Sequence, residues 1–384
     1  MAETIVILGA GWTGLPLAHK LLKYTLAKKT IKVILVTPNT HFFWNVAATR
    51  GIIPGEFSED QLFLPIAPGF AGYPSAAFEF VLGKAQSIDA SRNTVSVLLT
   101  DDNGNHCEIR YDQLVIATGS RVAGNLPLKP TGDAHEETLS AWRALQDKIS
   151  KAGDVIVAGS GPTGIEVAGE LAARYGRSKP VTLIMSGDKP LGSHASVLPS
   201  VRDAIEADLA KLGVAIVRGQ RVAQVTEAAG RTRVRLSDGS ELQADCYLPL
   251  FGLRMNTGFV PPAWLDGDGN VAVDDHFKVV GAENVWALGD AGSMEPKQIT
   301  VTDNQIIYLA SHLDAILTGA TPSKAYRPEE KTLIFLSLGK RYATGQIGDW
   351  RLFGFLVSWV KGRRLFTDTA RGYVAGEKLR HSSL

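Results

Sequence analysis

The sequence predicts an α/β protein with two similar parallel-sheet domains and a small α+β unit at the C-terminus. The first observation is a glycine-rich turn, Gly-Ala-Gly-Trp-Thr-Gly at 9–14, which follows an apolar run at 4–8. The second is a similar turn, Gly-Ser-Gly-Pro-Thr-Gly at 159–164, which follows an apolar run at 155–158. A strand, a tight glycine turn and a helix in this order are typical of a βαβ unit, so its recurrence predicts a repeated domain.

The composition is that of an ordinary globular protein of about two or three domains. The chain has 384 residues, and its 40 Lys and Arg residues offset 39 Asp and Glu residues to leave a net charge of +1. This balance gives no electrostatic basis for a nucleic-acid partner, and we expect none. The only cysteines are Cys107 and Cys246, which we expect to be buried thiols. Neither a disulfide framework nor a metal site is predicted.

The sequence does not predict secretion or a membrane span. The first expected strand begins near Thr4, and position 2 is alanine, so neither a signal peptide nor a myristoylation signal is expected. The apolar run at 352–360 is shorter than the roughly 20 residues that a spanning helix needs. We therefore expect a cytoplasmic protein that is not secreted and is at most peripheral on a membrane.

Each half of the chain is expected to follow the same order of elements. The first half has strands at 4–8, 31–36 and 114–117, a helix at 15–22, an irregular segment at 42–74 and a hairpin of strands at 94–99 and 108–111. After a linker at 125–138, the second half has strands at 155–158, 181–185 and 214–217, helices at 166–175 and 201–212, and a hairpin at 231–236 and 241–244.

The domain boundaries follow from this repeat. Residues 255–325 have no glycine turn of the same kind, so we expect them to complete the first domain. The predicted domains are a discontinuous first domain of residues 1–125 and 255–325, a second domain of 126–254, and a C-terminal domain of 326–384.

The two glycine turns predict where two dinucleotides bind in Rossmann-like domains. Glycines let the backbone turn tightly and approach a pyrophosphate, which lies on the amide groups of a helix N-terminus. The candidate residues are Gly9, Gly11 and Gly14 in the first turn and Gly159, Gly161 and Gly164 in the second. For either turn alone, a tight turn without a ligand is the alternative.

The residues that end the second strand of each unit bear on the dinucleotide. This position usually holds Asp or Glu, which binds the adenosine ribose, but here the two positions hold Thr37 and Ser186. At the second site, the missing carboxylate would no longer repel a 2′-phosphate, and Lys189 would attract one. The sequence therefore favours NADPH slightly over NADH.

Two further segments predict strand ends that face a cofactor. Residues 115–120 are an apolar strand that leads into the small residues Thr118 and Gly119. Residues 284–290 deliver Asp290 to the end of a buried strand, where ligands collect in open α/β sheets. Capping of the following helix is the alternative role for Asp290.

In this order, the motifs G-A-G-W-T-G, A-T-G-S, G-S-G-P-T-G-I-E and A-L-G-D resemble those of two-dinucleotide flavoprotein reductases of the glutathione-reductase-like type. Segments 41–50 and 335–348 are similar to the apoptosis-inducing-factor-like branch, and within it to the ferroptosis suppressor group and its fungal relatives. The resemblance implies FAD in the first domain, NADH or NADPH on the second, and reduction of a quinone or a similar small acceptor.

The resemblance also implies roles for single residues. The residues expected to contact FAD are Gly9, Gly11, Gly14, Thr37, Asn45, Arg50, Thr118, Gly119 and Asp290. Those expected at NADH or NADPH are Gly159, Gly161, Gly164 and Ser186. Glu166 stands where this family has a glutamate near the nicotinamide and the flavin. Its alternative is an exposed glutamate in the first helical turn, where the helix dipole favours it.

One departure from the disulfide reductases of this fold concerns the path of electrons. Those enzymes carry a C-x-x-x-x-C pair, whereas residues 42–46 are Phe-Phe-Trp-Asn-Val. We therefore expect electrons to pass directly from the flavin to a small acceptor. A helix starting after about Lys297 would direct its dipole at the anionic reduced flavin, and Lys297 would add charge, with a solvated lysine as the alternative.

The C-terminal domain combines aromatic and basic residues. They are Phe353, Phe355, Trp359 and Phe366, with Lys361, Arg363 and Arg364. This combination suits a peripheral membrane patch, while core packing and a homodimer contact are the alternatives.

The sequence is also compatible with two other functions. One is a pathway-specific flavoenzyme that acts on a natural product. The other is a signalling or interaction protein whose shape is set by its cofactors.

Overall fold

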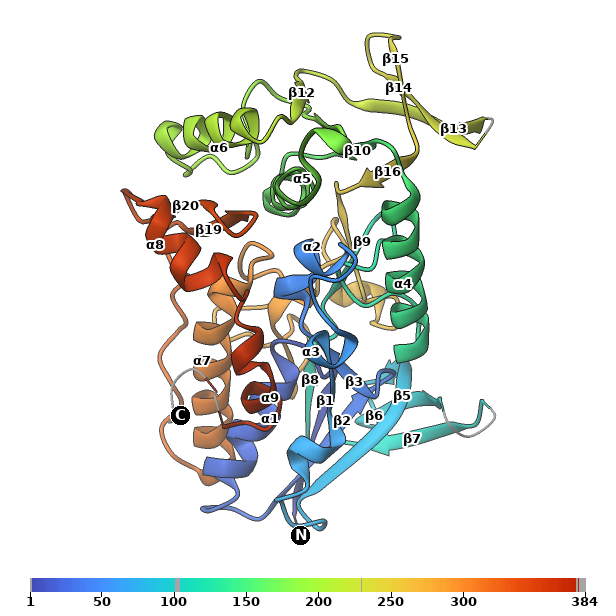
Figure 1. Cartoon of the computed structure of the whole chain (residues 1–384). Coiled ribbons are helices and arrows are strands. Elements are labelled where there is room, and N and C mark those ends of the chain that lie inside the picture. Colours follow the sequence, from blue (N-terminus) through green and yellow to red (C-terminus); the bar gives the residue numbers. More distant parts are fainter. Residues whose placement is uncertain (1, 101–103, 229, 378, 380–384) are drawn as a thin grey trace.

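This computed structural model describes residues 2–100, 104–228, 230–377 and 379. Within these residues, the first domain is built on a seven-stranded sheet (Figure 1). Its strands, in spatial order, are β18 (Val285–Ala287), β8 (Gln113–Ile116), β1 (Glu3–Leu8), β2 (Ile31–Thr37), β5 (Phe78–Asp89), β6 (Thr94–Leu99) and β7 (His106–Arg110). The central strands β8, β1 and β2 pair in parallel and are almost entirely buried, as apolar runs require in a sheet covered on both faces. Since β18 pairs with β8, the chain returns to this sheet after the second domain.

Strand β5 is the element of this sheet that the sequence patterns do not predict. Its first part pairs in parallel with β2, and its second part pairs antiparallel with β6. Most of its side chains are half-buried or exposed, so it lacks the apolar run or clean alternation that indicates a strand. The predicted hairpin of β6 and β7 is confirmed, while the turn residues 101–103 lie outside the described residues.

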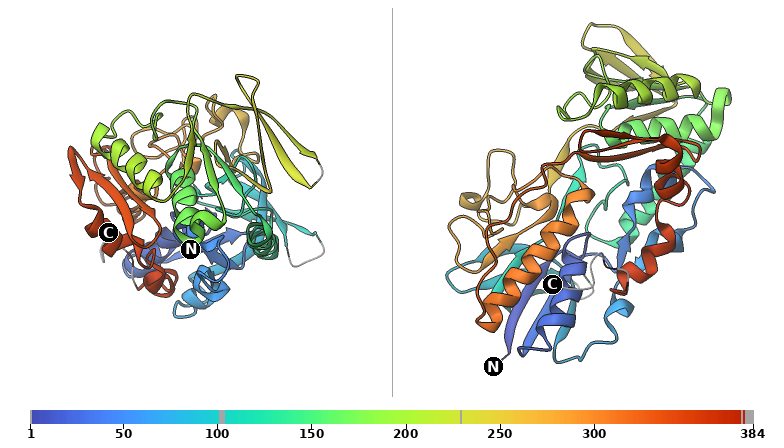
Figure 2. Two further views of the ribbon diagram at one scale, coloured as in Figure 1. Left: turned by 45° about the horizontal axis from the view of Figure 1, so that its top comes forward. Right: turned by 90° about the vertical axis from the view of Figure 1, so that its left-hand side faces the viewer.

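Two helices lie side by side against the first sheet (Figure 2). Helix α1 (Gly14–Lys20) continues into a π-helical turn (Leu21–Thr25), and α7 (Ile299–Thr318) ends at Gly319, which has a φ of +73°. Both helices follow strand ends of the sheet. The predictions of a helix after the first glycine turn and of another after Lys297 are confirmed.

The segment predicted to be irregular contains short regular elements. They are β3 (His41–Phe43), a 3-10 turn (Asn45–Ala47), α2 (Ala48–Gly51), α3 (Glu59–Leu62), β4 (Phe63–Pro65) and a second 3-10 turn (Ala67–Phe70). β3 and β4 form an antiparallel pair, and most of their side chains are buried. The prediction of an irregular segment was wrong because each of these elements is too short to show a helical or strand period in its hydrophobic residues.

The predicted linker runs into α4 (His135–Lys151), which the sequence patterns also do not predict. Its buried face carries Trp142, Leu145 and Ile149 at helical spacing, so the signal is present in the sequence. Two short strands, β9 (Ser120–Val122) and β17 (Leu253–Met255), pair antiparallel where the chain enters and leaves the second domain.

The second domain has a four-stranded parallel sheet within the described residues. Its order is β12 (Ala215–Val217), β11 (Val181–Ile184), β10 (Val155–Ala158) and β16 (Cys246–Pro249). Helices α5 (Pro162–Tyr175) and α6 (Pro199–Lys211) follow β10 and β11, as predicted. The predicted hairpin is part of a three-stranded meander of β13 (Val222–Ala228), β14 (Arg231–Leu236) and β15 (Glu241–Ala244).

The C-terminal unit begins with an antiparallel sheet of β19 (Leu333–Leu338), β20 (Tyr342–Ile347) and β21 (Trp350–Leu352). It continues through α8 (Gly354–Val357), a π-helical turn (Ser358–Gly362), a 3-10 turn (Thr367–Thr369) and α9 (Ala370–Val374). β19 packs against α5, so this unit lies on the second domain as well as on the first (Figure 2).

The two cysteines lie on different sheets. Cys246 on β16 is buried, as expected, and burial raises the pKa of its thiol to about 11. Cys107 on β7 is only half-buried because β7 is an edge strand, so the expectation of two buried thiols was wrong for this residue.

Candidate functional site

A cleft of about 1900 Å³ runs along both domains and the C-terminal unit. Gly9 and Gly11 line it from the first glycine turn, and Gly161 lines it from the second. It lies at the carboxyl ends of the parallel strands, where open α/β sheets bind their ligands. The structure therefore brings the two predicted dinucleotide sites into one space.

The first glycine turn has three positions with different constraints. Gly9 has a φ of +106°, and a Cβ there would lie 2.4 Å from the carbonyl oxygen of Ala117. A Cβ on Gly14 would lie 1.9 Å from the carbonyl oxygen of Gly9, so α1 can start this close to β1 only at a glycine. A Cβ on Gly11 would meet no atom within 4 Å, which leaves this backbone open to the cleft.

The second turn repeats this geometry. Gly159 has a φ of +118°, and its Cβ would lie 2.3 Å from the carbonyl oxygen of Leu250. A Cβ on Gly164 would lie 1.9 Å from the carbonyl oxygen of Gly159, and one on Gly161 would meet no atom within 4 Å. In a dinucleotide site, glycines serve a tight turn, close helix packing and an open approach for the pyrophosphate. Both turns fit that purpose.

A charged network lies at the end of β18. The Asp290 carboxylate accepts hydrogen bonds from Ser120 Oγ and from Lys129 Nζ, each at 2.6 Å. Burial alone would raise the pKa of Asp290, but Lys129, Ser120 and Lys297 hold it below its usual value. Asp290 therefore faces the cleft as a carboxylate held in one orientation.

Lys297 also lines the cleft, just before α7. Its ammonium donates a hydrogen bond to the carbonyl oxygen of Gly292. Burial lowers the pKa of Lys297, while the carboxylates of Asp290 and Asp266 oppose that effect. The alternative of a freely solvated lysine does not fit this position.

Several other predicted residues line the same cleft: Thr37, Asn45, Thr118 and Gly119. Thr118 and Asn256 hold each other through two hydrogen bonds of 2.8 and 2.9 Å, each from a side chain to the other residue's carbonyl oxygen. Asn45 Oδ1 accepts a hydrogen bond of 2.6 Å from Trp12 Nε1. These contacts fix the backbone and side chains that face the space beside the first glycine turn.

Outside the two glycine turns, the predicted cofactor residues Arg50 and Ser186 do not line the cleft. Arg50 is 1% exposed and forms a two-point ion pair with Glu170 at 2.7 and 2.8 Å, so its guanidinium is not free to contact FAD. Ser186 is exposed just beyond the end of β11. Lys189, expected to attract a 2′-phosphate, is held by Asp203 at 3.0 Å and by Glu206 at 2.7 Å.

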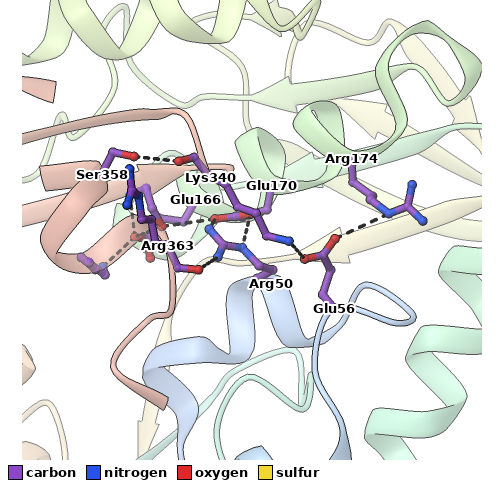
Figure 3. Close-up of polar contacts among 10 residues, drawn as sticks. Arg50, Glu56, Glu166, Glu170, Arg174, Lys340, Ser358 and Arg363 are labelled. Atoms are coloured by element: carbon purple, nitrogen blue, oxygen red, sulfur yellow. Dashed lines mark hydrogen bonds and ion pairs between the residues drawn. The ribbon is translucent and has the colours of Figure 1, made fainter. Parts of the chain in front are cut away.

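Glu166 lies on α5 (Figure 3) and lines the cleft together with Lys361. Lys361 Nζ donates a hydrogen bond of 2.7 Å to Glu166 Oε1 and another of 2.8 Å to the carbonyl oxygen of Phe335. The side chains of Glu166 and Lys361 are 8% and 14% exposed. The alternative of an exposed glutamate is therefore wrong, and Lys361 belongs to the cleft and not to a surface patch.

Sequence reasoning missed Lys361 as a site residue because its partner is distant in the chain. The fold supplies the contact by packing β19 against α5 and the π-helical turn Ser358–Gly362 against β19. The only sequence signal was a lysine beside an aromatic segment, which equally suits a surface.

An aromatic cluster forms one wall of the cleft. The Trp12 ring lies 4.6 Å from that of Trp44 and 5.1 Å from those of Phe42 and Tyr373. The Tyr373 hydroxyl donates a hydrogen bond of 3.1 Å to the carbonyl oxygen of Trp12, and burial raises its pKa well above the usual value. Phe42 and Trp44 of this wall belong to segment 42–46, where the resemblance to disulfide reductases would place a cysteine pair.

The described residues contain no group of three or more His, Cys, Asp or Glu side chains placed to hold a metal ion. In the same part of the chain, no helix is long and apolar enough to cross a membrane.

Residues 3–305 match the family model described as pyridine nucleotide-disulphide oxidoreductase. The chain belongs to this family. Members bind FAD and NADH or NADPH, so the chain is a flavoprotein oxidoreductase. Its two cysteines, Cys107 and Cys246, lie on different sheets. The predictions of enzyme class, fold class and cofactors are confirmed.

Relatives of this chain extend over nearly its whole length. Oxidoreductase ptaL of Pestalotiopsis fici is 39% identical and aligns over 98% of this chain and 99% of its own. Ferroptosis suppressor protein 1 of Homo sapiens is 26% identical over 95% and 94% of the two chains, which confirms the predicted resemblance. The sulfide:quinone oxidoreductase of Aquifex aeolicus shares the fold, with a TM-score of 0.75 at 18% identity over 99% of this chain and 93% of that chain.

Proposed function

We propose that this protein oxidises NADH or NADPH and reduces a small quinone-like acceptor. The observation that carries the proposal is the cleft, which both glycine turns and the Glu166–Lys361 ion pair line. The fold neighbour from Aquifex aeolicus is named a sulfide:quinone oxidoreductase, and residues 42–46 of this chain hold no cysteine pair. Both observations support an acceptor that enters the cleft.

The residues of the first domain fit FAD, which when bound supplies hydride acceptance and onward electron transfer. Gly9, Gly11 and Gly14 would place backbone amides on its pyrophosphate, beside the strand-end carboxylate Asp290. The residues that would lie along its length are Thr37, Asn45, Thr118 and Gly119. Lys297 and the N-terminus of α7 would place positive charge at the same part of the cleft.

The second turn would hold the nicotinamide dinucleotide. Gly159 and Gly164 keep the start of α5 close to β10, and Gly161 leaves its backbone open to the pyrophosphate. Ser186 lies further out, at the strand end where the adenosine ribose is expected.

Lys361 would provide the proton that the reaction consumes. NADH or NADPH supplies a hydride, which carries two electrons and one proton. Reduction of a quinone to a hydroquinone takes two electrons and two protons, so the reaction needs one more proton. Lys361 Nζ holds such a proton at the wall of the cleft, and the carboxylate of Glu166 fixes its position. A positioned acid of this kind contributes roughly 10²–10⁴-fold to a rate.

The test is the visible spectrum of the purified protein, followed by anaerobic addition of NADH or NADPH and then of a small quinone. We expect a flavin spectrum that bleaches with the nucleotide and recovers with the quinone. A colourless protein that cannot be reconstituted with FAD would overturn the proposal. Bleaching without recovery by any quinone would favour a specific natural-product substrate or a signalling role.

The proposal extends to the surface of the C-terminal unit. Phe353, Phe355 and Trp359 are 66–71% exposed, and Trp350 is 79% exposed, so core packing does not explain them. Exposed arginines are near them in sequence: Arg351, Arg363 and Arg364. Aromatic side chains beside basic ones suit the interface of an anionic membrane, so we propose a peripheral lipid contact here.

Flotation with anionic vesicles tests this contact. We expect the wild type to float and the triple variant Phe353→Ser, Phe355→Ser, Trp359→Ser to stay at the bottom. Phe251→Ser is the control, because Phe251 is 50% exposed but lies in the second domain. A wild type that does not float, and whose mass in solution is that of a dimer which the triple variant loses, would assign the surface to a second copy instead.

A further inference from the structure

A row of charged side chains leads from the cleft into the protein. From the cleft inward it consists of Lys361, Glu166, Ser337, Glu170 and Arg50, and we call it the charge row. Figure 3 labels three of its members, Glu166, Glu170 and Arg50. The outer ion pair lines the cleft, whereas the inner pair does not. The row joins α2 of the first domain, α5 of the second and the C-terminal unit.

The inner pair is almost completely removed from solvent. The side chains of Arg50 and Glu170 are 1% and 2% exposed. Arg50 Nε donates a hydrogen bond of 2.7 Å to Glu170 Oε2, and Arg50 Nη2 donates one of 2.8 Å to Glu170 Oε1. Arg50 Nη1 also donates a hydrogen bond of 3.3 Å to the carbonyl oxygen of Arg363. A buried ion pair of this kind is often no more stabilising than apolar residues of the same size, which leaves its purpose to be explained.

Ser337 connects the inner pair to the outer one. Its hydroxyl lies 3.4 Å from Glu166 Oε1 and 3.2 Å from Glu170 Oε1, and its backbone N–H donates to Glu166 Oε1 at 3.0 Å. The two glutamates are one helical turn apart on α5, so their carboxylates face the same side. Ser337 itself is fully buried. Each carboxylate therefore acts on the other with little screening by water.

The charges of the row act on one another in opposite senses. Burial raises the pKa of Glu170, Arg50 lowers it, and the negative charge of Glu166 raises it again. Glu56 lines a small pocket together with Arg50, and it pairs with Lys340 at 2.8 Å and with Arg174 at 3.6 Å. Removal of either inner charge would therefore change the field at Glu166 and Lys361, with opposite signs.

We propose that Arg50 and Glu170 are positioning residues that set the electrostatic field at the Glu166–Lys361 pair in the cleft. This inference rests on the proposed function for the part that concerns activity. Glu170 adds negative charge behind Glu166, which favours the proton on Lys361. Arg50 limits that effect, so the proton is held but can still be transferred.

The test compares Arg50→Gln, Glu170→Gln and the double variant with the wild type. In acceptor reduction, loss of Arg50 should move the alkaline fall of kcat up by about one pH unit, and loss of the Glu170 charge should move it down by about as much. The double variant should return near the wild-type value. Arg143→Gln is the control, because Arg143 makes a two-point pair with Glu59 at 2.6 Å on the surface and away from the cleft.

A second readout does not need activity. Because the pKa of Glu170 is raised in the folded state, its contribution to the free energy of unfolding is greatest below pH 4.5 and is lost as the pH rises. Urea unfolding between pH 4.5 and 7.5 should therefore give a steeper fall for Arg50→Gln and a shallower one for Glu170→Gln. The double variant lacks both charges and keeps the test open if Arg50→Gln alone does not fold.

Three pH profiles that coincide with that of the wild type while activity falls would overturn the inference, since the pair would then be only structural. Shifts of the same sign for both single variants would overturn it too. If the wild type reduces no quinone, the proposed function fails, but the unfolding slopes still decide whether the charges are coupled. Unchanged slopes would reject the coupling whatever the enzyme does.

Discussion

Lys361 Nζ lies 2.7 Å from Glu166 Oε1, although 195 residues separate the two in the chain. In Lys361→Met the apolar stem stays and the proton is lost, so we expect kcat for quinone reduction to fall by about 100-fold. Steady-state assays with saturating nucleotide and quinone measure this. Flavin content should not change, because the substitution leaves the glycine turns intact.

The matched control for this lysine is Lys340→Met. Lys340 also pairs with a glutamate, Glu56 at 2.8 Å, but it does not line the cleft. Its kcat should stay within about twofold of the wild type, as is usual for a surface pair. Full activity in Lys361→Met would remove this lysine from the proposed mechanism.

Gly11 and Gly14 separate the binding role of the first turn from its folding role. Alanine at Gly11 meets no atom within 4 Å, so the protein should fold but retain less FAD. The Cβ atom of Gly14→Ala would lie 1.9 Å from the carbonyl oxygen of Gly9. This substitution should therefore lower the free energy of unfolding by about 3 kcal/mol. The ratio of flavin to protein absorbance and urea unfolding measure the two effects. Full FAD content in Gly11→Ala would contradict the predicted pyrophosphate contact.

The second turn offers the corresponding prediction for the nicotinamide dinucleotide. Gly161→Ala should retain FAD, because Gly161 lies in the other domain, and should raise KM for NADH or NADPH by about tenfold. The expected change corresponds to about 1.4 kcal/mol of lost binding. Stopped-flow reduction of the flavin at several nucleotide concentrations measures it, and loss of FAD from this variant would contradict the assignment of the two turns.

Glu206 bears on the choice between NADPH and NADH. Its carboxylate binds Lys189 at 2.7 Å and Arg218 at 3.0 Å, which partly neutralises the charge expected to attract a 2′-phosphate. Glu206→Gln should free both cations and raise the ratio of kcat/KM for NADPH over NADH by roughly fivefold. Lys211→Ala, which removes a lysine from an ion pair on the same helix, should leave the ratio unchanged. A tenfold preference of the wild type for NADH would reject the predicted preference for NADPH.

His19 should make the stability of the first domain depend on pH. Its Nε2 donates to the carbonyl oxygen of Val374, and burial lowers its pKa from 6.5 to about 4. The stability that this neutral ring contributes is therefore present above pH 6.5 and is lost as the pH falls towards 4. The shift corresponds to about 3 kcal/mol. Urea unfolding at pH 7 and 4.5 should show this loss in the wild type and a smaller one in His19→Asn.

The parts of the site that could be predicted from the sequence are those whose constraint is local. Positions 14 and 164 require glycine because a carbonyl oxygen of the same motif lies too close for a Cβ atom. Positions 9 and 159 require glycine because a carbonyl oxygen at the end of the neighbouring strand does so. Asp290 was predictable because a buried strand places its last residue at the sheet edge, where ligands bind.

The rest depends on contacts that no local pattern records. Arg50 and Lys361 both read as surface or cofactor residues, yet each pairs with a glutamate on α5 that is more than a hundred positions away. β5 was missed because it changes partner along its length and so shows no single period. Trp359 shows the reverse case, because core packing was one of the roles that its aromatic character left open and its side chain is exposed.

The return of β18 to the first sheet sets an order for folding during synthesis. The strands of the second domain's parallel sheet all lie within residues 155–249, so that domain is complete when the ribosome reaches its end. The first sheet can be completed only after β18, at 285–287, has been synthesised. The hydrogen bond of His19 can form only after Val374 has been synthesised. Domains generally fold as units as they emerge, so the middle of this chain is expected to fold first. Helix α1 is therefore held by a residue that is synthesised 355 positions after His19.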